Sequence, residues 1–202
     1  MKPAPMKLVL ASSNQGKLQE LRELLGDAGV ELVAQSELGV EDAEETAVTF
    51  VENALLKARH ATALTGLPAL ADDSGLCVDA LHGAPGLYSA RYSGVHGDAQ
   101  ANIDKLLHEL RDVPEEQRGA HFYCVLVLVR HADDPQPLIA EGEWHGRIAF
   151  ERRGDGGHGY DPVFLDVERS RTAAEMPAEL KNRLSHRGKA LVALRQRLLA
   201  AL

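Results

Sequence analysis

The sequence predicts an α/β fold in which a mixed β-sheet is flanked by helices. Early in the chain, short apolar runs typical of strands alternate with amphipathic helical stretches. Later, two long strand-like runs follow each other with only a short turn between them, as in an antiparallel hairpin. Alternation favours parallel strands and the hairpin favours antiparallel ones, so both observations together predict a mixed sheet.

The first half of this pattern is read from apolar spacing and from the residues that interrupt it. Leucines recur on one face of a helical stretch that begins near Leu18, and Gly66 and Pro68 end a second, longer helical pattern. The expected elements are a strand at 7–11, a polar turn at 12–16, a helix, a strand at 30–34, an acidic loop at 36–45 and a helix at 46–65.

The second half contains longer strands and two helices whose starts are marked by capping residues. Asp98 and Ser185 each precede a run with leucines at helical spacing, and both residue types cap helices well. The expected elements are a strand at 68–71 ending in a turn, a strand at 76–81, a loop at 83–86, a helix after Asp98, strands at 122–129 and 138–150, a glycine-rich loop at 154–159 and a helix after Ser185.

Composition narrows the class of protein. The 202 residues suffice for one domain with a real core, and 45% hydrophobic content is ordinary for a globular chain. A net charge of −8 argues against a general nucleic-acid binder. No apolar run reaches the roughly 20 residues that span a bilayer, and residues 1–7 lack a signal-peptide core. Cys77 and Cys124 resemble small core residues, so a reducing compartment, the cytoplasm, is expected.

Ala71-Asp72-Asp73-Ser74-Gly75 is the most informative stretch, because two carboxylates directly follow a buried strand. Mg²⁺ prefers carboxylate ligands, and substrate phosphates usually complete such a site. Successive strand residues point to opposite faces, so one Asp can face a ligand while the other supports the turn. An ordinary Asx turn is the alternative interpretation.

Other motifs carry phosphate-binding or metal-binding potential, each with a structural alternative. Asn53 and Lys57 share one helix face, which is either a ligand-binding face or a solvated one. Glu44 and Glu45 precede that helix. Either one of them is a second metal ligand, or both simply place favourable negative charge at the start of a helix. The turn 12–16 and Lys17 lie at the start of the first helix. They form either an anion-binding site or an ordinary helix cap.

Two late motifs point to a base-binding region. In Gly157-His158-Gly159-Tyr160-Asp161-Pro162, the glycines allow close approach of a ligand, Tyr160 can stack on a base, and Asp161 can accept a hydrogen bond. The alternative is a tight loop that enters a strand. Ser185-His186-Arg187, with Lys181 upstream, places cations at a helix start, where an anionic or carbonyl-bearing ligand would offset the dipole.

Taken in order, these motifs resemble the inosine/xanthosine triphosphate pyrophosphatase family over about residues 7–194. The matching segments are Ser12-Ser13-Asn14-Gln15-Gly16-Lys17, Phe50-Val51-Glu52-Asn53-Ala54 with Lys57-Ala58, Ala71-Asp72-Asp73-Ser74-Gly75, Gly83-Ala84-Pro85-Gly86, Gly159-Tyr160-Asp161-Pro162 and Ser185-His186-Arg187.

This resemblance implies one pyrophosphatase domain over 1–202, elongated, with two lobes and an active-site cleft between them. It implies a Mg²⁺-dependent homodimer that cleanses the nucleotide pool by hydrolysing inosine, deoxyinosine and xanthosine triphosphates to monophosphate and pyrophosphate, through water attack on the α-phosphate. The implied roles are phosphate binding by Ser12, Ser13, Asn14, Gln15, Gly16, Lys17, Lys57 and Ser74; metal binding by Glu45 and Asp73, with Asp73 also activating water; and base binding by His158, Gly159, Tyr160, Asp161, Lys181, His186 and Arg187.

Two positions depart from the family pattern, and two other functions stay open. Ser13 replaces a usual Gly and His158 a usual Phe. Residues 10–13 followed by Glu20-Leu21 also faintly resemble septum-associated nucleotide pyrophosphatases, which prefer other bases, but their Ser-Pro-Arg-Arg opening is absent. A non-catalytic nucleotide sensor is the second alternative, disfavoured because a sensor needs no water-activating carboxylate.

Overall fold

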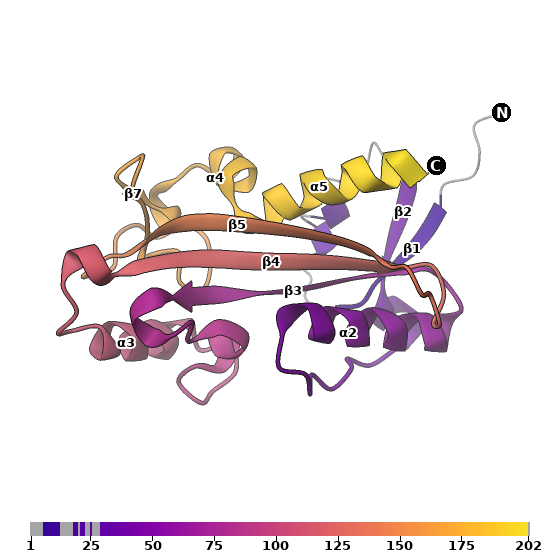
Figure 1. Ribbon diagram of the computed structural model, residues 1–202, viewed down its shortest axis with the longest axis horizontal. Coiled ribbons are helices and arrows are strands. Elements are labelled where there is room, and N and C mark those ends of the chain that lie inside the picture. Colours follow the sequence, from indigo (N-terminus) through magenta and orange to yellow (C-terminus); the bar gives the residue numbers. More distant parts are fainter. Residues whose placement is uncertain (1–5, 13–17, 20, 23–24, 26–28, 202) are drawn as a thin grey trace. The chain divides into compact units, whose positions relative to one another are not determined.

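The computed structural model describes residues 6–12, 18, 19, 21, 22, 25 and 29–201 (Figure 1). Contacts divide the chain into two compact units. Unit 1 takes in the chain up to Asp73, together with Val125–Glu141 and Ala190–Leu202, and unit 2 consists of Ser74–Cys124 and Gly142–Lys189. Each unit therefore contains pieces from distant parts of the sequence.

The strands form a seven-stranded mixed sheet, which confirms the predicted fold class. Its order is β2-β1-β3-β4-β5-β6-β7. Strand β1 is parallel to β2 and β3, whereas β6 is antiparallel to β5 and β7. The strands are β1 (Met6–Leu10), β2 (Val30–Ala34), β3 (Ala69–Val78), β4 (Gly119–Val129), β5 (Leu138–Ile148), β6 (Phe164–Asp166) and β7 (Arg171–Thr172).

Helices and short 3₁₀ turns connect these strands. The α-helices are α2 (Phe50–Thr65), α3 (Ala99–Glu109), α4 (Ala178–Leu184) and α5 (His186–Ala201). The 3₁₀ turns are η2 (Gln35–Leu38), η3 (Asp79–Leu81), η4 (Gly86–Arg91), η5 (Glu115–Gln117) and η6 (Ala173–Glu175). Among the described residues, no helix is both long and apolar enough to cross a bilayer.

Unit 1 is built around β1, whose Leu8, Val9 and Leu10 are fully buried. Helix α2 packs against this strand (Figure 1). The predicted helix after the polar turn is present at its described positions, and its leucines Leu18 and Leu21 are buried. The apolar spacing read from the sequence therefore identifies the core of this unit.

Helix α2 starts later than predicted because Thr49 caps it. The Thr49 hydroxyl accepts a hydrogen bond from the Glu52 amide at 3.3 Å, and the chain before it is not helical. At the other end, Gly66 adopts a left-handed conformation with φ 69°, which confirms the predicted stop. Asn53 is only 3% exposed, so the solvated-face interpretation of that side of the helix is wrong.

Strand β3 corrects one sequence-based expectation. A turn was predicted at Asp72-Asp73-Ser74-Gly75, with separate strands before and after it, but β3 continues from Ala69 to Val78 without interruption. Asp is a poor strand former, yet β3 lies between two other strands, and pairing with neighbours overrides local preference.

Unit 2 has an aromatic core. Phe122 lies 4.5 Å from Phe164 between ring centroids, and Trp144 lies 5.0 Å from Phe164 in an edge-on arrangement. The Trp144 indole donates to Asp166 at 3.1 Å. Helix α3, capped by Asp98 as predicted, adds Ile103 and other apolar side chains to this core.

A buried arginine joins two elements of unit 2. Arg118 is 1% exposed, and burial lowers the pKa of its guanidinium. The guanidinium donates to the carbonyl oxygens of Leu110 (2.6 Å) and Ile148 (2.8 Å), and to those of Val113 and Ala149. The chain just after α3 is thereby tied to the end of β5.

Candidate active site

A lysine flanked by two carboxylates is the first candidate cluster, and it lies within unit 1. Lys57 Nζ is 2.7 Å from Glu45 Oε1 and 3.7 Å from Asp73 Oδ1. The side chains of Lys57, Glu45 and Asp73 are 12%, 31% and 13% exposed. Residues from a loop, a helix and a strand therefore converge at one partly buried point.

Helix α2 and the segment before it fix this geometry. Asn53 Oδ1 accepts a hydrogen bond from the Ala47 amide at 3.0 Å, which holds the chain between Glu45 and the helix. Lys57 stands one turn after Asn53 on the same helix face. Of the two glutamates considered from the sequence, Glu45 is the one that contacts Lys57.

The carboxylates control the charge of Lys57. Burial lowers the pKa of the Lys57 ammonium, but Asp73, Asp72 and Glu45 together raise it by more. The net shift is therefore upward from 10.5. Lys57 is therefore a fixed cation at neutral pH. Three neighbouring carboxylates against one ammonium leave an excess of negative charge, which favours a cation.

Strand alternation separates the two adjacent aspartates. Asp72 is 1% exposed, whereas the neighbouring Asp73 side chain is 13% exposed and near Lys57. Side chains at consecutive strand positions point to opposite faces, so Asp72 and Ser74 share the other face of β3. The two aspartates therefore have different environments, but neither supports the expected turn, because β3 continues through both.

The second cluster lies in unit 2 and is organised by Asp161. This carboxylate accepts a hydrogen bond from the His158 amide at 2.7 Å and pairs with the Lys181 ammonium. Asp161 is 4% exposed, so Lys181 compensates a nearly buried charge. A Cβ atom on Gly157 would overlap the Asp161 carboxylate, which explains a glycine at that position.

Tyr160 takes a different place from the one expected of a base-stacking ring. Its side chain is 5% exposed and belongs to the aromatic core, and its hydroxyl donates to the Ser89 carbonyl at 2.9 Å. Burial raises the pKa of this phenol, with a smaller contribution from Tyr92. His158 beside it is exposed at the tip of the loop.

The start of α5 forms a third group within unit 2. Ser185 Oγ accepts from the Gly188 amide at 3.0 Å, so the predicted cap is confirmed. His186 stacks on Phe122 at 4.9 Å between ring centroids. Arg187 is 5% exposed, and its Nη2 lies 3.5 Å from Ser74 Oγ.

The structure thus brings several of the expected residues together in groups. Glu45, Lys57 and Asp73 form the first group, and His158, Asp161 and Lys181 the second. Ser12 is half-buried at the end of the first strand. The expected phosphate-binding residues Ser13, Asn14, Gln15, Gly16 and Lys17 lie outside the described residues.

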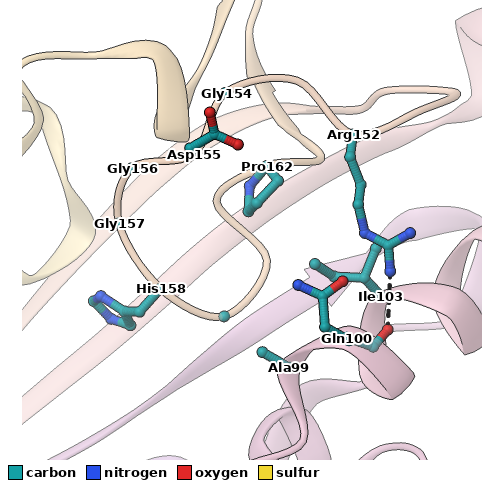
Figure 2. Close-up of a pocket in the computed structure, with 11 residues that line it drawn as sticks. Ala99, Gln100, Ile103, Arg152, Gly154, Asp155, Gly156, Gly157, His158 and Pro162 are labelled. Carbon is teal, nitrogen blue, oxygen red and sulfur yellow. Dashed lines mark hydrogen bonds between the residues drawn. The ribbon is translucent and has the colours of Figure 1, made fainter.

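A hollow of about 370 Å³ in unit 2 was not foreseen from the sequence (Figure 2). It lies between the glycine loop 154–159 and the first turn of α3. Arg152 crosses it, donating to the Gln100 carbonyl at 3.0 Å and to Asp104 at 2.8 Å. In Figure 2 the His158 ring points away from the side chains of Gln100 and Arg152. No sequence signal pairs an arginine with an aspartate 48 positions away.

Comparison with known proteins identifies the family of the chain. The family model described as the Ham1 family matches residues 8–197. The chain belongs to the Ham1 family. A relative from Xanthomonas campestris, named dITP/XTP pyrophosphatase, is 64% identical over 95% of this chain and 96% of its own length. One from Pectobacterium atrosepticum, with the same name, is 59% identical over 92% of this chain and 94% of its own length.

A solved structure supports the same membership of the Ham1 family. The HAM1 protein from Coxiella burnetii superposes with a TM-score of 0.92 at 49% identity, covering 96% of this chain and 99% of that one. The family resemblance inferred from the motifs is confirmed over nearly the whole chain.

Proposed function

We propose that this chain hydrolyses non-canonical purine nucleoside triphosphates, those of inosine, deoxyinosine and xanthosine, to the monophosphate and pyrophosphate. Its Ham1 relatives are named dITP/XTP pyrophosphatases. The observation that carries the proposal is Lys57 between Glu45 and Asp73, a cation and two carboxylates at one point. Such a set suits binding of a phosphate chain and activation of water. The reaction would remove non-canonical nucleotides from the nucleotide pool.

Glu45 and Asp73 fit a divalent cation, which we assign as Mg²⁺. A divalent metal is what membership of this pyrophosphatase family implies. Both side chains offer carboxylate oxygens near a cluster with excess negative charge. Within the described ranges, no group of three or more His, Cys, Asp or Glu is placed to hold a metal, so substrate phosphates would complete the site, as is usual for Mg²⁺. When bound, the cation neutralises phosphate charge.

Asp73 is the general base of the proposed reaction. Its partly exposed carboxylate takes the proton of a water molecule whose oxygen attacks the α-phosphorus. The bond from that phosphorus to the bridging oxygen breaks, and pyrophosphate leaves. Lys57, held charged by its neighbours, binds the phosphate oxygens as negative charge shifts onto them.

The remaining phosphate contacts are assigned by resemblance. Ser12 to Lys17 and Ser74 complete the phosphate-binding set in this proposal. Ser74 stands directly after Asp73 in β3, and its hydroxyl lies near Arg187.

The base is assigned to the loop that carries Asp161 and to the start of α5. Lys181, His186 and Arg187 present donors to a 6-oxo purine, and exposed His158 offers a ring for stacking. Adenine has an amino group at that position, so donors facing it stay unsatisfied, at a cost of roughly 1–3 kcal/mol each. The Tyr160 ring is buried, so the backbone of Gly159-Tyr160, rather than the ring, would contact the base.

Two further assignments belong to this proposal. The protein is cytoplasmic, which is supported by two free cysteines, Cys77 and Cys124. It acts as a homodimer, as its resemblance implies. Size-exclusion chromatography with light scattering tests the second assignment directly.

A substrate panel tests the function. Inosine, deoxyinosine, xanthosine, guanosine and adenosine triphosphates are incubated with and without Mg²⁺, and monophosphate, pyrophosphate and orthophosphate are measured. We expect pyrophosphate from the first three substrates only when the metal is present. Orthophosphate as the primary product would indicate a γ-phosphate hydrolase, and tight binding without turnover would indicate a sensor.

A further inference from the structure

The loop 154–161, which is the glycine loop 154–159 with the two residues after it, is attached to the segment that contains β7 and η6. The Gly156 amide donates to the Ala174 carbonyl at 3.2 Å, and the Ala174 amide donates to the Asp161 carbonyl, also at 3.2 Å. Ala174 thus holds the middle and the end of the loop at once. The Thr172 hydroxyl donates to the Arg153 carbonyl at 2.7 Å, which fixes the start of the loop on the same segment.

The loop also lies tightly against this segment. A Cβ atom on Gly154 would come within 2.8 Å of Ala174 and 2.9 Å of Glu175. A Cβ on Gly156 would come within 2.7 Å of the Ala174 carbonyl oxygen. These glycines serve contact between two pieces of backbone, so the position of the loop depends on the position of η6.

Arg153 and Glu175 form a side-chain ion pair between the start of the loop and the same segment. Arg153 Nη2 donates to Glu175 Oε2 at 2.9 Å and to the Ser170 carbonyl at 3.0 Å, and its Nε lies 3.4 Å from Glu175 Oε1. Glu175 Oε2 also accepts from the Thr172 amide at 2.7 Å. One carboxylate therefore holds the guanidinium at the start of the loop and the backbone of the supporting segment.

We propose that Arg153 and Glu175 are positioning residues that place the loop 154–161 for nucleobase binding. Neither touches the substrate; they act through the backbone that carries His158 and Asp161. This inference rests on the proposed function. It adds that the affinity for the base can be changed separately from the reaction at the phosphates. Loosening the loop weakens base binding equally in the ground state and the transition state, so KM rises while kcat is kept.

Matched variants make the inference testable. Arg153→Met removes the guanidinium, and Glu175→Gln keeps an acceptor for the Thr172 amide while removing the charge. Arg147→Met is the control, because Arg147 has the same 39% side-chain exposure as Arg153 but only a 3.9 Å contact with Glu115. Arg153→Lys, which keeps the charge but not the planar fork, should recover part of the lost affinity.

Steady-state kinetics with inosine triphosphate and Mg²⁺ give the main readout. We expect KM to rise about tenfold, or roughly 1.4 kcal/mol, in Arg153→Met and Glu175→Gln, with kcat changed less than about twofold. The double variant should be no worse than either single one, because the two residues act as a unit. Inhibition by inorganic tripolyphosphate, which has no base, should keep its inhibition constant, and the control should match the wild type.

Two results would overturn the inference: an unchanged KM in folded variants, whether or not the melting temperature falls, or inhibition by tripolyphosphate that weakens as much as the binding of inosine triphosphate. A wild type that does not hydrolyse inosine triphosphate contradicts the proposed function instead. In that case hydrogen exchange decides the positioning role. Faster exchange of the Gly156 and His158 amides in Arg153→Met supports it, and unchanged exchange refutes it.

Discussion

Lys57 Nζ lies 2.7 Å from Glu45 Oε1, although an irregular loop and the start of a helix separate the two residues in the chain. The same ammonium lies 3.7 Å from Asp73 Oδ1, on a strand. A cation held between two carboxylates is fixed in place by both of them, and these neighbours raise the pKa of the Lys57 ammonium against the effect of burial. The site is therefore charged and arranged before a substrate arrives, and each member has a separable role.

Asp73→Asn should nearly abolish turnover of inosine triphosphate. The amide keeps the volume of the carboxylate but cannot take a proton from water, and loss of a positioned base costs roughly 10²- to 10⁴-fold in rate. Single-turnover kinetics with Mg²⁺ give the rate, and circular dichroism checks the fold. Near-normal turnover in the folded variant would move the base to Asp72 or Glu45.

Lys57→Met should lower kcat/KM by roughly 10²- to 10³-fold, the usual cost of one electrostatic stabiliser of the transition state. Methionine retains most of the volume of the lysine stem without its charge. Lys105→Met is a control for loss of a lysine outside the site, because Lys105 is 43% exposed and contacts Glu109 and Tyr92 rather than any candidate site residue. Equal kinetics for both variants and the wild type would remove Lys57 from catalysis.

The raised pKa of Lys57 also predicts how stability depends on pH. Its folded-state pKa lies above the ordinary 10.5, so the charged form contributes stability that is fully present below pH 10.5. That contribution is lost as pH rises through the raised folded-state value. Urea unfolding should show a constant difference between wild type and Lys57→Met from pH 7 to about pH 10, which shrinks only above 10.5. A difference that shrinks below pH 9 would contradict the assignment.

Arg187→Met should narrow the preference for inosine over adenosine triphosphate. Arg187 is nearly buried, and methionine fills much of its volume, which limits the effect on folding. A 6-oxo group pairs with a donor and a 6-amino group does not, so the loss falls mainly on the inosine substrate. The measurement is kcat/KM for both substrates in both proteins. An unchanged ratio would leave discrimination to Lys181, His186 and the backbone amides.

Gly157→Ala should disturb base binding far more than Gly159→Ala. Both glycines have positive φ, at 74° and 59°, so both variants carry backbone strain. Only at Gly157 does the added methyl group overlap the Asp161 carboxylate, since nothing lies within 4 Å of a Cβ on Gly159. KM for inosine triphosphate and the melting temperature should therefore change more in Gly157→Ala. Equal effects would mean that backbone strain alone matters.

The sequence is informative where local periodicity decides the structure. The strand at 30–34 and the end of helix α2 at Gly66 were predicted at the positions observed, because apolar spacing and a left-handed glycine are local signals. The turn at Asp72-Asp73 was predicted wrongly, since strand pairing is a non-local effect.

For the candidate site, the sequence supplies residue types but not partners. Family resemblance led us to expect that Lys57 and Asp73 act together. The effect of Asp72, which raises the pKa of Lys57, follows only from the folded structure. Arg153 and Glu175 carried no recognisable motif, and their pairing across 22 positions depends on how β7 returns to the loop. Side-chain pairs of this kind need the three-dimensional arrangement.

Arg118 has a consequence for how unit 2 comes apart. Its guanidinium joins the carbonyl of Leu110 to that of Ile148, and the Ile148 amide donates back to the Arg118 carbonyl at 2.9 Å. The buried guanidinium cannot be hydrated until its hydrogen bonds to both carbonyl groups are broken. We therefore expect the chain just after α3 and the end of β5 to open in a single cooperative event, as one foldon, although the two segments are far apart along the chain.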